Sequence, residues 1–459
     1  MYPKKGWPLS EAELSFAESL VSDLGPLGYS LTREGEVLTF QQRVPASIRE
    51  YRTFYRAAHA KVHANLLRPN IEEIVAFEND IGADIFIDGT ALDLGRIEPI
   101  LRPVNLHAPD TSPRDKAIVE YIRAYQTVTS RKAVGKENVY ILEDRGQLKS
   151  TVMGVLVLTS PRYYQARRDE VLGWLSPSRI RSLSERQQAR QKRVRLAGLD
   201  RMMHLSICCA LPPYSQLGTA RLLAVAPFTK IVREDFARRW ARKDSDLAIV
   251  TTTTSMGITG VPFQALRRGK FVDQENAELL GDNWNKAGKL YARLGDVHPW
   301  KASTPIKSSE IFANFGKLIS AETYAKASLL LSTDGSSSLS PNKVLDRALN
   351  ELGLSGRGLR GNPLGVFIGA LDRQSIEAVA SGKPRTKRPV LNWDLAVQQF
   401  RSDYGEASDP TKKPGVNKDE RAAAIKRRRE RAVNVRREDI LLSRRFLAEL
   451  KGDVTDEED

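Results

Sequence analysis

Two apolar runs of strand length lie near the middle of the chain, at residues 202–210 and 247–254. A helical pattern that begins after Tyr214 and reaches Trp240 separates them, and two prolines end the first run. Runs that are this short and uniformly apolar are typical of strands buried on both faces, as in parallel sheets whose strands are joined by crossover helices. The sequence therefore predicts a parallel strand–helix–strand unit, and with it an α/β centre.

The remaining patterns divide the chain into four regions. Residues 139–142 and 152–158 predict a hairpin around Gly146, whereas Ser10 and Glu13 form a capping box and the stretch after Pro45 has a helical apolar face. A chain of 459 residues is long enough for two or three domains. We expect a mainly helical N-terminal region (1–130), a central α/β domain (131–260), a mixed C-terminal region (261–385), and a linker with a mobile basic helical arm and an acidic tail (386–459).

The positive charge of the chain is clustered. Lysine and arginine total 71 against 56 aspartates and glutamates, a net charge of +15, and the excess gathers in residues 162–201 and 418–451. Clustered cations focus a field that attracts polyanions, so DNA or RNA is the expected partner. The alternative for each cluster is a solvated charged helix. The candidate nucleic-acid-binding residues are Arg167, Arg168, Arg190, Arg193, Lys426, Arg427, Arg428 and Arg429.

Other classes of protein are disfavoured. No apolar stretch approaches the roughly 18 residues that cross a bilayer, and the first residues lack a leader pattern, so we expect a cytoplasmic protein without a membrane partner. His59 and His63 are four residues apart but lack a third ligand, and Cys208 and Cys209 are adjacent packing residues, so we expect no metal. No Gly-Lys pair has the flanking residues of a phosphate-binding loop, which argues against a nucleotide-driven motor.

A family resemblance rests on the order of the central motifs. These are residues 152–161, Arg168-Asp169, Gly173-Trp174, 211–218 and 247–257, with weaker support from 97–104, 345–354 and 366–371. As a set they resemble the DruA family of the bacterial Druantia anti-phage system. The resemblance implies a component of a multi-gene defence complex that works with other Druantia subunits, including a helicase-like protein. Residues 131–136 depart from the glycine- and arginine-rich segment that many relatives have before the first hairpin.

The strand–loop–helix–strand order in the centre is also similar to acetyltransferases of the Gcn5-related fold. The resemblance implies a coenzyme A-type cofactor, with its pyrophosphate at Ser215, Gln216, Gly218 and Ala220, where loop and helix N–H groups would face phosphate. The loop departs from that family, since it has one glycine where two small positions and a basic or glutamine lead-in are preferred. Fold similarity without acyl-CoA chemistry is the alternative.

Catalytic residues are not identified by the sequence, and Tyr214 and Asp169 are candidates only. Tyr214 is a catalytic phenol, a stacking surface or a packing residue, and Asp169 is a functional acid or part of a salt bridge at a helix N-terminus. His204, inside an apolar strand, is interpreted as a core histidine. We expect nucleic-acid engagement in an anti-phage complex, with two alternatives: a Gcn5-like group transferase acting on a nucleobase or protein, or a scaffold that binds only sister subunits.

Overall fold

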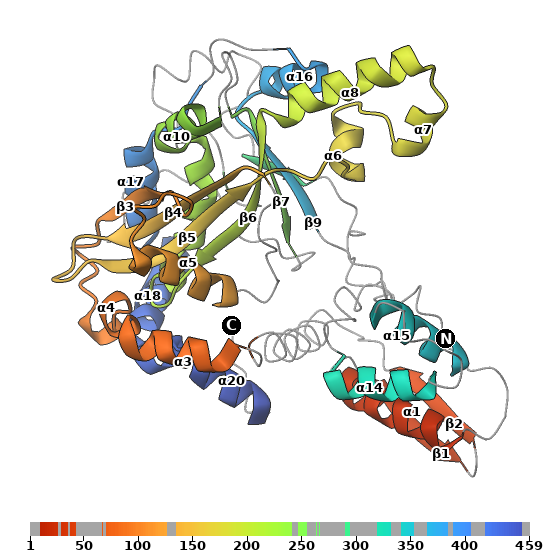
Figure 1. The fold of residues 1–459 in the computed structure, drawn as a ribbon. Helices are drawn as coiled ribbons and strands as arrows, with labels where there is room; N and C mark the ends of the chain where they lie inside the picture. Colours follow the sequence, from red (N-terminus) through yellow and green to blue (C-terminus); the bar gives the residue numbers. More distant parts are fainter. Residues whose placement is uncertain are drawn as a thin grey trace. The chain divides into compact units, whose positions relative to one another are not determined.

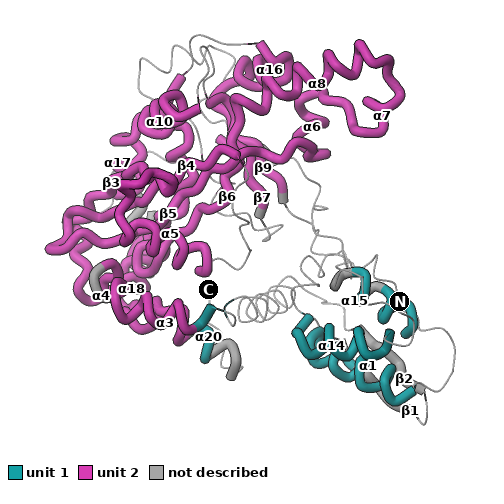
Figure 2. The backbone as a smooth tube through the Cα atoms, viewed as in Figure 1, with its two compact units in different colours: residues 1–71, 297–364, 446–459 teal, residues 72–296, 365–445 magenta. Residues whose placement is uncertain are grey.

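The structure is a computed structural model, and contacts divide the chain into two compact units (Figure 2). Unit 1 comprises residues 1–71, 297–364 and 446–459, and unit 2 comprises residues 72–296 and 365–445. The residues that the structure describes are 10–25, 29–34, 37–42, 70–125, 135–240, 247–254, 290–293, 319–331, 341–352, 365–383, 389–404 and 418–451, together with Leu67, Phe263 and Leu266. The predicted helix after Pro45, with His59 and His63, and the acidic tail lie outside these residues.

Unit 1 joins the start of the chain to a distant segment. It contains α1 (Glu11–Leu24), a hairpin of β1 (Tyr29–Glu34) and β2 (Val37–Gln42), α14 (Ala321–Leu330) and α15 (Pro341–Glu351). The predicted capping box of α1 is present at Ser10 and Glu13. Asp23 accepts hydrogen bonds from the Ser320 amide and the Thr323 hydroxyl, both at 2.7 Å, so the end of α1 caps the start of α14.

Unit 2 is built on a seven-stranded mixed sheet in the order β3-β4-β5-β6-β7-β9-β8 (Figure 1). The strands are β3 (Pro99–Val104), β4 (Glu137–Asp144), β5 (Thr151–Thr159), β6 (Met202–Ala210), β7 (Ile249–Thr254), β8 (Tyr291–Arg293) and β9 (Gly365–Ala370). Neighbouring strands are antiparallel except β6 and β7, which are parallel. The predicted hairpin and the predicted parallel pair are both confirmed, and the centre is mixed α/β.

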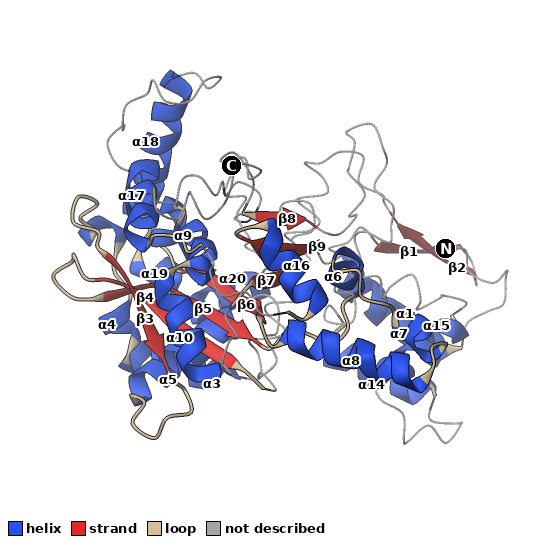
Figure 3. Cartoon of the chain, turned by 90° about the horizontal axis from the view of Figure 1, so that it is seen from above, coloured by secondary structure: helices blue, strands red, loops and turns tan. Residues whose placement is uncertain are grey.

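Helices cover both faces of this sheet (Figures 1 and 3). One apolar core joins Met203 and Leu205 of β6 to residues of α9, α10, α17 and α18, and a second joins Met202 to Trp174 and to Val379 of α16. The described helices of unit 2 are α3 (Ile71–Asp80), α4 (Gly82–Ile85), η3 (Gly89–Ala91), α5 (Pro113–Tyr125), α6 (Ala166–Val171), α7 (Pro177–Arg181), α8 (Glu185–Leu199), η4 (Tyr214–Leu217), α9 (Thr219–Val225), η5 (Ala226–Phe228), α10 (Lys230–Trp240), α16 (Arg373–Ser381), α17 (Trp393–Tyr404), α18 (Lys418–Asn434), α19 (Arg437–Ile440) and the start of α20 (Leu442–Lys451).

The basic C-terminal segment is part of unit 2 over residues 418–445, whereas the sequence predicted a mobile arm. Ala432, Ile440 and Leu442 are fully buried, and the Gly89 amide donates to the Val435 carbonyl at 2.7 Å. Glu78 accepts hydrogen bonds from the amides of Leu442 and Ser443 at the start of α20. Buried apolar residues of α18, α19 and α20 therefore dock this charged segment on unit 2.

The described part of the N-terminal region contains strands as well as helices. The hairpin β1–β2 falls within it, and β3 supplies one edge of the main sheet. Apolar residues two positions apart, Tyr29 and Leu31 in β1 and Leu38 and Phe40 in β2, favour strands over a helix.

Candidate functional site

The candidate nucleic-acid surface is a helical insert between β5 and β6, formed by α6, α7 and α8 (Figure 1). From residue 177 to residue 194 it carries six cations against one acid, Glu185. All six cations are exposed, and none forms an ion pair with any residue that the structure describes. They are Arg179, Arg181, Arg186, Arg190, Lys192 and Arg193.

Three of these arginines lie on one face of α8. Arg186, Arg190 and Arg193 follow the i, i+4, i+7 spacing that places side chains in one row along a helix. The helix begins at a capping box of Ser184 and Gln187, and this cap separates α8 from α7. The row of unpaired charge is thus displayed on a regular, capped element.

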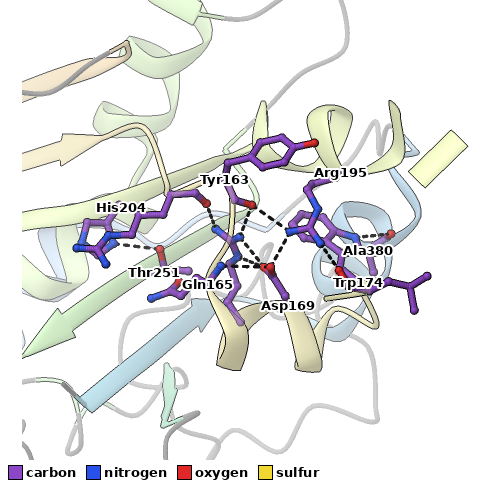
Figure 4. Close-up of polar contacts among 11 residues, drawn as sticks. Tyr163, Gln165, Asp169, Trp174, Arg195, His204, Thr251 and Ala380 are labelled. Carbon is purple, nitrogen blue, oxygen red and sulfur yellow. Dashed lines mark hydrogen bonds and ion pairs between the residues drawn. The ribbon is translucent and has the colours of Figure 1, made fainter. Parts of the chain in front are cut away.

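A buried ion cluster anchors the insert (Figure 4). Arg168 and Arg195 share the carboxylate of Asp169: Arg168 Nε donates to Oδ1 at 2.8 Å and Arg195 Nη1 donates to Oδ2 at 2.6 Å. The side chains of the two arginines are 0% and 2% exposed. Their other N–H groups donate to the carbonyls of Arg162, Tyr163 and Leu175.

Aromatic rings surround the second of these charges. The Arg195 Cζ lies 4.5 Å from the ring centroid of Tyr164, 5.1 Å from that of Trp174 and 5.5 Å from that of Tyr163. Since one carboxylate cannot neutralise two guanidinium groups, ring faces and carbonyl dipoles supply the remaining compensation. The cluster ties α6 to the last turns of α8, and Trp174 Nε1 donates to Ala380 of α16 at 3.0 Å.

These positions correct part of the sequence prediction. Arg167, Arg190 and Arg193 are exposed. Arg168 is buried, so its guanidinium is not accessible to a phosphate at the surface. Asp169 is the anchor of the insert through its ion pairs, in line with the salt-bridge interpretation. Sequence reasoning could not separate Arg168 from its neighbours, because burial depends on residues brought together by the fold.

The second basic cluster lies on α18. Lys426 and Arg427 are exposed, whereas Arg428 and Arg429 are partly buried. The helix packs against η4 and η3, so it adjoins the predicted cofactor loop.

The predicted cofactor loop lies where β6 gives way to α9. Gly218 has φ +90°, a left-handed conformation that favours glycine, and a Cβ placed there would meet no atom within 4 Å. The amides of Ser215, Gln216 and Gly218 already donate to Leu211, Pro213 and Ser215. At the first turn of α9, Thr219 and Ala220 have no acceptor within their own helix.

Tyr214 fixes this loop to the neighbouring hairpin through its side chain. It is fully buried, its hydroxyl donates to Asp144 Oδ2 at 2.9 Å, and it lies 2.6 Å from the Thr151 hydroxyl. Asp144 also accepts from the Glu98 amide at 2.8 Å and the Gly146 amide at 3.0 Å. Tyr214 therefore links the loop to the hairpin, and its hydroxyl faces the protein interior.

The parallel strands β6 and β7 separate beside this loop. β6 pairs with β7 only from Met202 to Leu205, although it pairs with β5 as far as Ala210. The β5–β6 register shifts at Ser206, and such bulges occur often next to active sites. Cys208 and Cys209, at the end of β6, are partly buried and form no disulfide. Burial raises the pKa of the Cys208 thiol, which keeps it protonated.

His204 occupies the other end of β6. Its Nδ1 lies 3.2 Å from the Thr251 hydroxyl (Figure 4). Burial, with a further contribution from Arg162 and Arg168, lowers the pKa of His204 to about 4. The imidazole is therefore neutral at physiological pH.

No family model, curated protein or solved structure matches this chain. Within the described ranges, no group of three or more histidine, cysteine, aspartate or glutamate residues is placed to hold a metal ion. The helices in the same part of the chain include none with the length and apolar character that a membrane span requires.

Sequence reasoning did not single out Arg195 or Tyr164. Arg195 looks like any other member of the basic cluster, and only the fold shows that it is enclosed. The signal for Tyr164 was available, because Tyr163 and Tyr164 form an aromatic pair directly after Arg162.

Proposed function

We propose that this protein is a cytoplasmic, nucleic-acid-associated component of a Druantia-type anti-phage system, acting with other subunits that include a helicase-like protein. The family assignment rests on the resemblance of the central motifs. The observation that carries nucleic-acid binding is the row of exposed, unpaired arginines on α8, held in place by the buried Arg168–Asp169–Arg195 cluster.

Unpaired surface cations favour phosphate binding for a physical reason. An arginine that already pairs with a carboxylate must lose that partner before it binds phosphate, whereas the α8 arginines pay no such cost. Each phosphate contact releases condensed counterions from the nucleic acid, and this release favours binding. Because phosphate is the same at every nucleotide, we expect binding with little sequence preference.

The test replaces Arg186, Arg190 and Arg193 together by glutamine. Loss of three phosphate contacts should reduce the slope of log affinity against log salt by about 2 for single strands or about 3 for duplex. The melting temperature should stay close to wild type, because the three side chains are exposed and form no ion pair with a described residue.

A matched control removes the same charge elsewhere on unit 2. The variant Arg145→Gln, Lys230→Gln, Arg373→Gln alters side chains that are 52%, 75% and 80% exposed. Equal loss of affinity in both triple variants would indicate a nonspecific charge effect and refute the α8 surface. If the wild type binds no nucleic acid and the α8 variant still loses phage protection, the scaffold that binds sister subunits would be favoured.

A second candidate function is group transfer with a coenzyme A-type cofactor, on a nucleobase or protein. The separation of β6 from β7 supports it, since ligands of such sheets bind beyond the carboxyl ends of parallel strands and residues 206–210 have no described partner strand on the β7 side. If the resemblance to the Gcn5-related fold holds, the pyrophosphate would lie at the loop of Ser215, Gln216, Gly218 and Ala220. The amides of Thr219 and Ala220 would then be its donors.

Calorimetry with coenzyme A tests this candidate. Gly218→Glu should abolish binding and phage protection in a folded protein, because a carboxylate would occupy the open space beside the loop. A folded Gly218→Glu variant that still protects, or a wild type that binds no coenzyme A, would refute the cofactor site.

A further inference from the structure

Tyr164 is an exposed aromatic residue at the base of the helical insert. Its relative exposure is 41%, the highest among the aromatic side chains whose exposure the structure describes. Its sequence neighbours Arg162 and Arg167 are exposed as well. A large ring left open to water among cations is a candidate contact for a ligand that is both flat and anionic.

The ring is held in a defined orientation. The Arg195 guanidinium lies 4.5 Å from its centroid, and the Tyr163 and Tyr164 rings are nearly perpendicular, with centroids 4.7 Å apart and planes at 85°. Arg195 is itself fixed by Asp169 and by the carbonyls of Tyr163 and Leu175. A ring that is fixed before binding loses little rotamer freedom when a second ring stacks on it.

Stacking discriminates between forms of nucleic acid. In a duplex both faces of each internal base are covered by neighbouring bases, whereas an unpaired strand offers base faces to aromatic side chains. Under the proposed function, the arginines of α7 and α8 would bind either form through phosphate, whereas Tyr164 would gain a contact only with an unpaired base.

We propose that Tyr164 is a stacking platform for a base, and that the helical insert binds single-stranded nucleic acid in preference to duplex. This inference rests on the proposed function, from which it takes the phosphate-binding arginines.

Fluorescence anisotropy of the full chain with a labelled single strand and with its duplex tests the proposal. Tyr164→Ala should weaken single-strand binding by about 5- to 150-fold, the usual range for losing one aromatic–base stack, and leave duplex binding unchanged. Tyr164→Phe should restore single-strand binding, because the ring remains.

Leu196→Ala is the matched control, since Leu196 follows Arg195 and is an exposed apolar side chain at 44% without a flat face. It should leave both affinities unchanged. Ultraviolet crosslinking of wild-type protein to a single strand that contains iodouracil gives a second readout if Tyr164→Ala fails to fold, with Tyr164 as the expected crosslinked residue.

The outcomes separate the two proposals. Equal affinity for both nucleic acids with no effect of Tyr164→Ala, or crosslinks on the insert that exclude Tyr164, would overturn the stacking platform while nucleic-acid binding stands. A wild type that binds neither form at low salt would overturn the proposed function, and the stacking platform with it.

Discussion

Asp169→Asn removes the charge that two buried arginines share. Arg168 donates to Oδ1 through Nε at 2.8 Å and Nη2 at 2.5 Å, and Arg195 donates to Oδ2 at 2.6 Å. Asparagine has nearly the same shape but no charge, and its NH₂ group would face a guanidinium N–H. Two enclosed cations would then have no carboxylate partner among the described residues.

The expected loss of stability is large. Removing one partner of a buried ion pair costs about 3–5 kcal/mol. For the roughly 300 residues of unit 2, with an unfolding entropy of about 2 cal/mol/K per residue, this corresponds to a fall of about 5–8 °C in melting temperature. Because Arg195 lies near the end of α8, backbone amides of α8 should also lose protection from hydrogen exchange.

The assay combines thermal melting by circular dichroism with hydrogen exchange. Glu170→Gln is the matched control, because it makes the same chemical change one residue later, in an exposed pair with Arg167 at 3.3 Å. Exposed pairs contribute little, so this variant should melt like wild type. If Asp169→Asn also melts like wild type and α8 keeps its protection, the cluster does not anchor the insert.

Three further predictions concern stability. Because the pKa of His204 is lowered, the unfolded chain binds a proton that the folded chain excludes between about pH 6.5 and about pH 4. The free energy of unfolding should therefore fall by about 1.4 kcal/mol per pH unit over this range. His204→Gln should flatten this dependence in thermal melts at acidic pH. Deleting residues 410–459 should unfold unit 2 or lower its melting temperature markedly, because Ala432 and Ile440 leave the core and Glu78 loses its amide donors; a truncated protein with wild-type melting would contradict this. Gly218→Ala should cost about 1–2 kcal/mol in chemical denaturation through its left-handed backbone alone, and unchanged stability would contradict that reason.

Local patterns predicted the centre of the fold. The apolar run of β6, the hairpin β4–β5 and the cap of α1 each depend on residues close in sequence, so periodicity and capping residues indicate them. The helical pattern from Tyr214 to Trp240 was predicted as continuous, yet it breaks into η4, α9, η5 and α10. Gly218 in a left-handed conformation ends the first piece, and Pro227, which lacks an N–H donor, lies at the break between α9 and α10.

Tertiary contacts explain what the sequence did not indicate. Arg168 and Arg167 are adjacent and chemically identical, but only Arg168 meets Asp169 and the carbonyls that enclose it. Similarly, the charged composition of α18 concealed the docking of Ala432 into the core. Both cases require knowledge of which distant segment lies opposite.

The most direct test of the account is the salt dependence of binding of wild-type protein to a single-stranded oligonucleotide. If the six unpaired cations of residues 177–194 each neutralise a phosphate, affinity should fall about 10²- to 10³-fold from about 50 to about 200 mM salt. Binding that is absent at the lower salt concentration, or that barely changes between the two, would contradict a nucleic-acid surface on α7 and α8.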